Sequence, residues 1–172
     1  MKPIHISYLS LGSNLDDKLE NLEKAVRRIH ESIAQVQAVS SVYETPAWGF
    51  EGNDFYNICI EIHTELTADT LLKSILDLEI QLGRTRKNDD NYHNRTIDID
   101  IISFGQEVTS TSQLILPHPK AVDRKFVLYP LQEINKNFVF PASNTPIDIA
   151  LKNCVDNSTI NKTNQRIVVP KA

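Results

Sequence analysis

Hydrophobic residues at the start of the chain follow two patterns of different period. Residues 4–11 (IHISYLSL) are short, apolar and partly alternating, which predicts a buried strand. The glycine and polar residues at 12–14 end this strand, and Ser13 or Asn14 is expected to cap a helix that follows. The apolar stripe of that helix, at steps of three and four, consists of Leu15, Leu19, Leu22, Val26, Ile29 and Ile33.

Two further strand patterns occupy residues 35–43 and 55–65, and the second alternates regularly. The connection 44–54 (ETPAWGFEGND) is longer than a hairpin needs and contains Trp48, the one tryptophan of the chain. Long connections in compact domains tend to carry function, and the structural alternative is a surface loop closed on Trp48 and Phe50. The connection is therefore a candidate binding loop.

The middle of the chain repeats the order of helix, loop and strand. Apolar residues at helical spacing between Thr67 and Gly83 predict a second helix. The polar stretch 84–94 (RTRKNDDNYHN) predicts a loop, and residues 96–104 (TIDIDIISF) predict a strand. Beyond Gly105 the chain is irregular, with a short helix after LPHP and a second near Pro146–Asn153.

The order strand, helix, strand, strand, helix, strand is the βαββαβ plan of ferredoxin-like α+β domains. We expect an antiparallel sheet with helices packed on it, followed by short elements toward the C-terminus. Residues 155–172 are polar and weakly patterned, so a loosely attached tail is expected there. Without repeats or a low-complexity block, residues 1–172 are expected to form a single domain.

Composition indicates an ordinary globular protein of 172 residues, with 41% hydrophobic and 23% charged residues. No apolar run has the length of a membrane span, and the first residues lack the pattern of a signal peptide. Cys59 and Cys154 lie far apart and share no metal-ligand spacing with the histidines. We therefore expect free thiols, a cytoplasmic location, no membrane partner and a monomer.

The net charge of −4 argues against nucleic acid as a partner, but basic residues gather in two places. The first group lies within residues 84–95 and the second within residues 120–125. A net acidic chain with two local cationic clusters suits a small polyanion. Two solvated loops are the alternative explanation.

Asp98 and Asp100 are the clearest chemical signal in the sequence. Residues i and i+2 of a strand point to the same face, about 6.6 Å apart along the backbone. Two carboxylates so placed can share Mg²⁺, a cation that prefers oxygen ligands. A solvated strand face is the alternative for a D-x-D pattern alone.

The basic loop leads directly into this strand, and Arg95 lies three residues before Asp98. Phosphoryl transfer needs metal ions that bridge phosphate oxygens and cationic side chains near the developing charge. The chain contains no G-x-x-x-x-G-K-[ST] sequence, so a P-loop is excluded. Phosphoryl transfer with metal held by the two aspartates is the function that these residues favour.

A flat heterocycle is the second ligand that the residues suggest. Phe55 and Phe126 are aromatic residues near polar loops, and Asn57 lies on the same strand face as Phe55. Two rings can enclose a heterocycle while an amide recognises its edge. Packing of both rings in the core is the alternative.

Together these segments resemble the hydroxymethyl-dihydropterin pyrophosphokinase family, over about residues 7–142. The combination of GRTRK and RTIDID in this order and spacing is specific. The matching segments are SLGSNL at 10–15, SSVYETPAWG at 40–49, FYNICIEI at 55–62, LEIQLGRTRK at 78–87, RTIDIDIISFG at 95–105, LPHP at 116–119 and DRKFVLYPL at 123–131.

The resemblance implies that a pterin hydroxymethyl oxygen attacks the β-phosphorus of ATP and that AMP leaves, in folate synthesis. It implies two Mg²⁺ ions on Asp98 and Asp100, with ATP as the co-substrate. The catalytic residues would be Arg84, Arg95, Asp98 and Asp100. The ATP-binding residues would be Glu79, Arg84, Arg86, Lys87, Arg95, Ile101, His118 and Arg124.

The resemblance also implies a pterin site closed by the connection 44–54 and by the loop 84–95. Phe55 stands where a tyrosine is familiar in the family, and Trp48 replaces a smaller apolar residue. The tail after residue 155 matches no part of the family. The pterin-binding residues would be Thr45, Pro46, Trp48, Phe55, Asn57 and Phe126.

Three other functions are compatible with parts of the pattern. A metal-dependent nucleotidyltransferase would also place paired aspartates on such a sheet, but it would release pyrophosphate. An RNA-recognition domain shares the predicted fold, yet the chain lacks its aromatic signature and has the wrong sign of charge. A ligand-sensing domain without catalysis leaves the D-x-D pattern beside four basic residues unexplained.

Overall fold

The computed structural model describes residues 1–85, 88 and 91–171. The helices are α1 (Lys18–Ser32), α2 (Ala68–Gln81), the 3₁₀ helix η1 (Ala121–Asp123), α3 (Lys125–Ile134) and α4 (Ile147–Asn153). The strands are β1 (His5–Ser13), β2 (Gln35–Val39), β3 (Ser41–Thr45), β4 (Phe55–Thr64), β5 (Asp98–Phe104), β6 (Thr109–Ser110), β7 (Ile115–Leu116), β8 (Val139–Phe140), β9 (Thr145–Pro146) and β10 (Asn161–Arg166).

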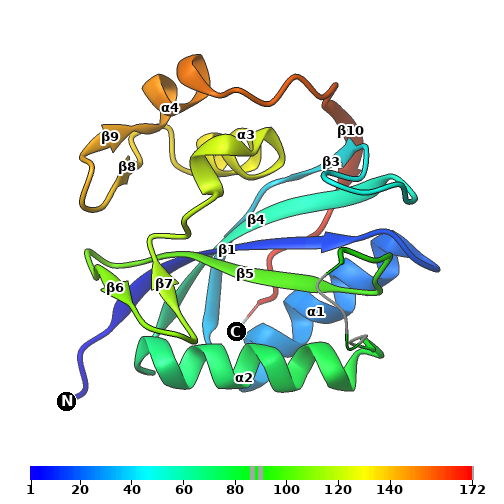
Figure 1. Ribbon diagram of the computed structural model, residues 1–172. Coiled ribbons are helices and arrows are strands. Elements are labelled where there is room, and N and C mark those ends of the chain that lie inside the picture. The colour runs from blue at the N-terminus through cyan, green and yellow to red at the C-terminus, as the bar shows by residue number, and fades with distance from the viewer. Residues whose placement is uncertain (86–87, 89–90, 172) are drawn as a thin grey trace.

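The main sheet has the order β10-β3-β4-β1-β5, and β2 also pairs with β4 (Figure 1). Each of these pairs is antiparallel, and the two pairs of β1, with β4 and β5, place it inside the sheet. The small pairs β6-β7 and β8-β9 lie outside it. This arrangement confirms the predicted ferredoxin-like α+β fold with short C-terminal elements.

Helices cover both faces of the sheet, which gives the domain three layers (Figure 1). The apolar stripes of α1 and α2 pack on one face against Leu11, Ile60 and other sheet residues. On the opposite face, α3 and α4 enclose a second cluster that includes Cys59 and Ile102. Both faces of β4 are therefore buried. The N-terminus of α3, with Arg124 as its N-cap residue, lies on the same side of the sheet as Asp98 and Asp100 of β5.

The start of α1 differs from the prediction. Asp17 is the N-cap, and its carboxylate accepts a hydrogen bond from the backbone N–H of Glu20 at 3.0 Å. Ser13 is instead the last residue of β1, and the Oδ1 of Asn14 accepts from the backbone N–H of Arg95 at 2.7 Å. Asn14 thus joins the end of β1 to the segment that enters β5.

The C-terminal residues also differ from the expectation of a loose tail. Asn161–Arg166 pair with β3 as an edge strand, and the hydroxyl of Thr163 donates to the carbonyl of Val42 at 2.8 Å. Ile167 is buried against the larger core. The sequence does not predict this strand, because an exposed edge strand needs no alternation of apolar residues. Backbone pairing with β3 holds β10 in place.

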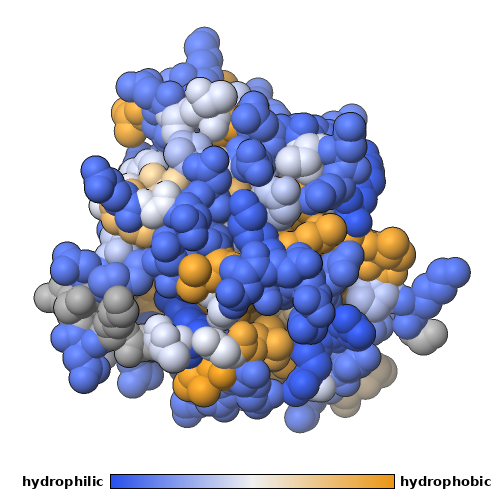
Figure 2. Space-filling view, turned by 90° about the vertical axis from the view of Figure 1, so that its right-hand side faces the viewer, coloured by the Kyte–Doolittle hydropathy of each residue, from blue (hydrophilic) through white to orange (hydrophobic). Residues whose placement is uncertain are grey.

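Hydrophilic residues dominate the face seen in Figure 2, with hydrophobic residues in separate patches between them. Within the described ranges, the chain contains no helix that is both long enough and apolar enough to traverse a lipid bilayer.

Ile60 and Ile6 offer a test of the packing. Ile60 is fully buried on β4, whereas Ile6 on β1 is 44% exposed. Ile60→Ala should lower the free energy of unfolding by about 2–5 kcal/mol, because it leaves a cavity in the core. Ile6→Ala is the matched control and should change that free energy by less than about 1 kcal/mol. Equal effects in urea denaturation would contradict the assigned register of the sheet.

Candidate active site

Strand β5 places its two aspartates and the isoleucine that follows each of them on opposite faces. Asp98 and Asp100 are partly exposed, while Ile99 and Ile101 are buried on the other face. In the antiparallel register with β1, Asp98 lies opposite Gly12 and Asp100 opposite Ser10. The two carboxylates therefore point to one face of the sheet, as the alternation predicts.

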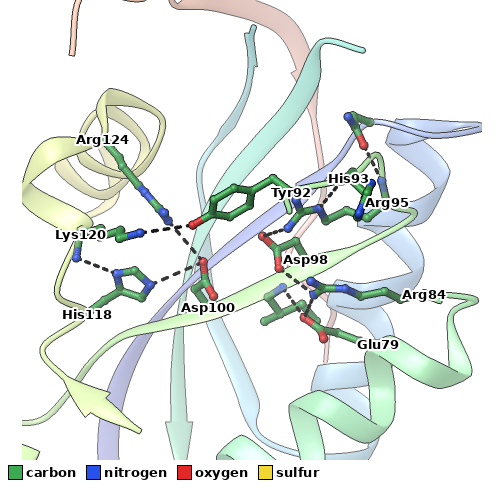
Figure 3. A network of polar contacts seen from close by, with 12 residues as sticks. Glu79, Arg84, Tyr92, His93, Arg95, Asp98, Asp100, His118, Lys120 and Arg124 are labelled. Atoms are coloured by element: carbon green, nitrogen blue, oxygen red, sulfur yellow. Dashed lines mark hydrogen bonds and ion pairs between the residues drawn. The ribbon is translucent and has the colours of Figure 1, made fainter. Parts of the chain in front are cut away.

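Arg84 joins helix α2 to the first aspartate (Figure 3). Its Nη1 lies 2.7 Å from the Oδ1 of Asp98 and 2.7 Å from the Oε1 of Glu79. Glu79 is 1% exposed and also accepts a hydrogen bond from the backbone N–H of Ile99 at 2.8 Å. One buried carboxylate thus fixes both the arginine and the strand residue between the two aspartates.

Arg95 approaches Asp98 from the loop before β5. Its Nη1 lies 3.3 Å from the Oδ2 of Asp98, and its Nε donates to the carbonyl of His93 at 2.9 Å. Its backbone N–H is held by Asn14. Contacts with His93 and Asn14 therefore position Arg95. Arg84 and Arg95 both form an ion pair with the carboxylate of Asp98.

The negative charge of Asp100 is less closely compensated than that of Asp98. Among the described residues, the side-chain nitrogens nearest to Asp100 are the Nε2 of His118 and the Nη1 of Arg124, which both lie 3.8 Å from its Oδ2. Burial and the neighbouring charge of Asp98 raise the pKa of Asp100 to about 7. Burial and the charge of Arg124 lower the pKa of His118 to about 4, so its imidazole is neutral at pH 7. Within the described part of the chain, Arg124 at 3.8 Å is therefore the permanently charged partner of the Asp100 carboxylate.

Arg124 is 7% exposed and lies between two aromatic rings. Its guanidinium carbon is 5.1 Å from the ring centre of Trp48 and 5.5 Å from that of Phe126. Its buried Nε has no hydrogen-bond partner in the described part of the chain. A buried donor without a partner is costly, so this side chain suits an anionic ligand that completes its hydrogen bonds.

A pocket of about 500 Å³, counting its open mouth, lies beside the aspartates and is named here the aromatic pocket. Asn57 and Thr45 are buried in its wall and share a hydrogen bond of 2.8 Å. Its lining residues are Ser10, Gly12, Thr45, Pro46, Trp48, Phe50, Phe55, Asn57, Tyr92, Arg95, Asp98, Asp100, Arg124 and Phe126.

A second, more open pocket, named here the cationic pocket, extends from the aspartates toward α2 and β7. Arg86 and Lys87, which the sequence also predicts to bind ATP, lie outside the described residues. The predicted ATP-binding residues that line it are Glu79, Arg84, Arg95, Ile101, His118 and Arg124, together with Asp98 and Asp100. The described site predictions therefore all lie in one pocket or both.

The sequence does not single out several lining residues. One of them is Gly12, where any larger residue would clash, because a Cβ there would lie 2.9 Å from the Oδ1 of Asn57. Tyr92 lines both pockets, and Lys120 lies near its hydroxyl at 3.4 Å (Figure 3). The ring of Tyr92 stacks beside Phe50 with centres 6.3 Å apart. An aromatic residue in the polar loop was the available signal for Tyr92.

The paired aspartates fit a divalent cation that is shared with a ligand. Among the described residues, no group of three or more histidine, cysteine or acidic side chains forms a complete metal cage. Mg²⁺ characteristically uses one or two protein carboxylates, with water and substrate phosphates as its other ligands. Two carboxylates with residual negative charge, bordered by arginines, match that requirement.

Comparisons with known proteins show the family of the chain. Residues 8–136 match the family model for 7,8-dihydro-6-hydroxymethylpterin-pyrophosphokinase (HPPK). The 2-amino-4-hydroxy-6-hydroxymethyldihydropteridine pyrophosphokinase of Bacillus subtilis is 43% identical over 132 residues, which cover 76% of this chain and 78% of that protein. The protein of the same name from Aquifex aeolicus is 38% identical over 141 residues, covering 81% and 86%.

Larger proteins contain a similar unit. The chain spans 20% of the Dictyostelium discoideum folic acid synthesis protein FOL1, with 38% identity over 140 residues. The crystal structure of Plasmodium falciparum HPPK-DHPS with pteroate has a TM-score of 0.71 at 15% identity, covering 87% of this chain and 42% of that chain, which shows a shared fold. From the family match and the close relatives, the chain belongs to the 7,8-dihydro-6-hydroxymethylpterin-pyrophosphokinase family.

Proposed function

We propose that the chain transfers a pyrophosphoryl group from ATP to the hydroxymethyl group of 6-hydroxymethyl-7,8-dihydropterin, releasing AMP, in folate synthesis. Membership of the family supports this activity. The observation that carries it is the junction of the two pockets, since a reaction between two substrates needs adjacent sites. The residues common to both pockets are Tyr92, Arg95, Asp98, Asp100 and Arg124.

The aromatic pocket receives the pterin in this proposal. Phe55 and Phe126 lie against the faces of the flat ring, because aromatic side chains bind such rings by stacking. Asn57 and Thr45 are buried at its wall, where amide, hydroxyl and backbone groups can bond the heterocycle edge. Pro46 and Trp48 border the pocket from the connection 44–54.

The cationic pocket receives the triphosphate of ATP. Arg84, Arg95 and Arg124 supply permanent positive charge toward it, and neutral His118 supplies a ring nitrogen beside Asp100. The buried Nε of Arg124 gains a partner when a phosphate oxygen is present. Arg86 and Lys87 are proposed to add charge from the same loop.

Transfer forms a bond from the pterin hydroxymethyl oxygen to the β-phosphorus and breaks the bond between that phosphorus and the α-phosphate oxygen. AMP carries away the bonding electron pair, and the hydroxyl proton passes to solvent. Asp98 and Asp100 would hold two Mg²⁺ ions, whose positive charge would offset the negative charge that develops during transfer. Arg95 and Arg124, at the junction, orient the β-phosphoryl group toward the pterin.

We also propose that the chain acts as a monomer, with ATP and 6-hydroxymethyl-7,8-dihydropterin as its small-molecule partners.

Product analysis tests the proposed reaction. The purified chain, incubated with ATP, Mg²⁺ and 6-hydroxymethyl-7,8-dihydropterin, should yield AMP and pyrophosphorylated pterin in equal amounts by chromatography. The products should be absent when the chelator EDTA removes Mg²⁺. Release of pyrophosphate without AMP would indicate a nucleotidyltransferase and would contradict the proposal. Folded protein that forms neither product would contradict it as well.

Asp100→Asn should separate activity from stability. Turnover should fall by on the order of 10²–10³, judged from the loss of comparable charge-stabilising groups. The pKa of Asp100 is raised to about 7 in the fold, so ionisation of this carboxyl destabilises the native state. The free energy of unfolding therefore falls as the pH rises from about 4 to 7. At pH 8 without metal, the variant should therefore be about 1–3 kcal/mol more stable.

Asp77→Asn on the exposed face of α2 is the matched control for Asp100→Asn and should change neither property. Turnover of Asp100→Asn near that of the unmodified chain would rule out the proposed metal role of Asp100. A loss of metal-free stability in urea denaturation at pH 8 would contradict the electrostatic account.

Glu79→Gln tests the support of Arg84. The substitution removes the charge that fixes Arg84 and should lower the free energy of unfolding by about 1–3 kcal/mol. It should raise the KM for ATP more than the KM for the pterin, since Glu79 lines only the cationic pocket. Glu65→Gln, at an exposed position after β4, is the control. Identical denaturation curves and KM values for the two variants would refute this role.

A further inference from the structure

Residues 155–166 connect two walls of the aromatic pocket. The family match ends at residue 136, so this segment lies beyond the matched region. It begins beside the N-terminus of α3 and continues into β10, which pairs with β3. Arg124 and Phe126 line the pocket at the start of α3, and Thr45 lines it at the end of β3.

Asp156 supplies the cap that α3 lacks in its own sequence. The N-cap residue of α3 is Arg124, whose side chain makes no capping hydrogen bond. The Oδ2 of Asp156 instead accepts a hydrogen bond from the backbone N–H of Lys125 at 3.0 Å. A carboxylate at this end of a helix is favoured by the exposed N–H groups and by the helix dipole.

The environment of Asp156 shows that this contact is built into the fold. The residue is 6% exposed, and its Oδ1 accepts from both the backbone N–H and the hydroxyl of Ser158. These hydrogen bonds and the charge of Lys125 outweigh burial and lower the pKa of the Asp156 carboxyl. Asp156 is therefore ionised at neutral pH, as a helix-capping carboxylate should be.

The cap acts on the two residues that flank Lys125. Arg124 precedes it and contacts the ring of Trp48, while Phe126 follows it on the pocket wall. A shift of the first turn of α3 would move the guanidinium of Arg124 away from both Trp48 and Asp100. The capped backbone thus fixes one pocket wall without a direct contact between Asp156 and a substrate.

The continuation of the segment fixes the opposite wall. Asn161 pairs with Glu44 and Lys162 with Tyr43, immediately before Thr45. The Nζ of Lys162 lies 2.8 Å from the Oε1 of Glu133 on α3. Glu133 also bonds Tyr43, so the later turns of α3 have a separate attachment to β3. At the first turn of α3, the described contact that attaches the helix to residues 155–166 is the hydrogen bond between Lys125 and Asp156.

We propose that Asp156 is a positioning residue of the pterin site, which acts through the first turn of α3 to hold Arg124 and Phe126. This inference rests on the proposed function for its kinetic consequences. Its structural consequence, the placement of Arg124 against Trp48, is measurable without any substrate.

Asp156→Ala, Asp156→Asn and the control Asp148→Ala test this proposal. Asp148 is an exposed aspartate in the first turn of α4, so its replacement removes the same charge near the N-terminus of a different helix. Asp156→Ala should weaken pterin affinity about three- to tenfold, the equivalent of losing one helix cap. Asp156→Asn keeps one acceptor oxygen and should recover part of this loss.

Fluorescence of Trp48, the one tryptophan in the chain, provides the direct readout. In ligand-free Asp156→Ala, quenching of Trp48 by acrylamide should increase, because Arg124 no longer covers the ring. Pterin affinity follows from titration of the same signal, and kinetics should show a larger change in pterin KM than in kcat. Quenching and pterin affinity equal to those of Asp148→Ala would overturn the proposal, even with lower thermal stability.

Ser158→Ala keeps the test decisive if Asp156→Ala does not fold. It removes one partner of the Asp156 carboxylate and leaves the cap residue in place. A smaller increase in Trp48 quenching is expected, and no increase would count against the proposal. If the unmodified chain made no AMP, the proposed function would fail, while the quenching comparison would still decide the placement of Arg124.

Discussion

Two like charges on one face of a single strand are the constraint on which the site depends. Asp98 and Asp100 cannot be separated by side-chain rotation alone, because both arise from β5 within a paired sheet. Arg84 and Arg95 compensate the charge of Asp98 at 2.7 and 3.3 Å, whereas Arg124, the nearest described arginine to Asp100, lies 3.8 Å from it. A divalent cation at this pair, as proposed, would balance the remaining negative charge.

The surrounding elements converge on that charge from different parts of the chain. Helix α2 contributes Arg84 through the buried Glu79, and the end of β1 holds Arg95 through Asn14. Helix α3 lies on the other face of the sheet (Figure 1), and Arg124 is its N-cap residue. Helices on both faces are therefore needed, because a two-layer domain would lack one set of cations. The C-terminal segment adds Asp156, whose carboxylate accepts a hydrogen bond from the backbone N–H of Lys125 in the first turn of α3.

The sequence predicts the parts of the fold that follow from periodic burial. The stripe of α1, the alternation of β5 and the order of elements all appear in the structure, and each described site prediction lines a pocket. The cap of α1 was wrongly predicted, because Asn14 has the right side chain for a cap but bonds Arg95 instead. Strand β10 and the cap by Asp156 depend on contacts distant in sequence, and residue types alone do not specify those.

Metal binding tests the central role of the aspartate pair most directly. Mn²⁺ prefers the same oxygen ligands as Mg²⁺ and can be counted by electron paramagnetic resonance. With an ATP analogue that cannot be cleaved, the chain should hold two Mn²⁺ ions per molecule more tightly than the nucleotide alone does. The double variant Asp98→Asn, Asp100→Asn should lose this extra binding while remaining folded. Equal Mn²⁺ binding by the double variant and the unmodified chain would contradict the account.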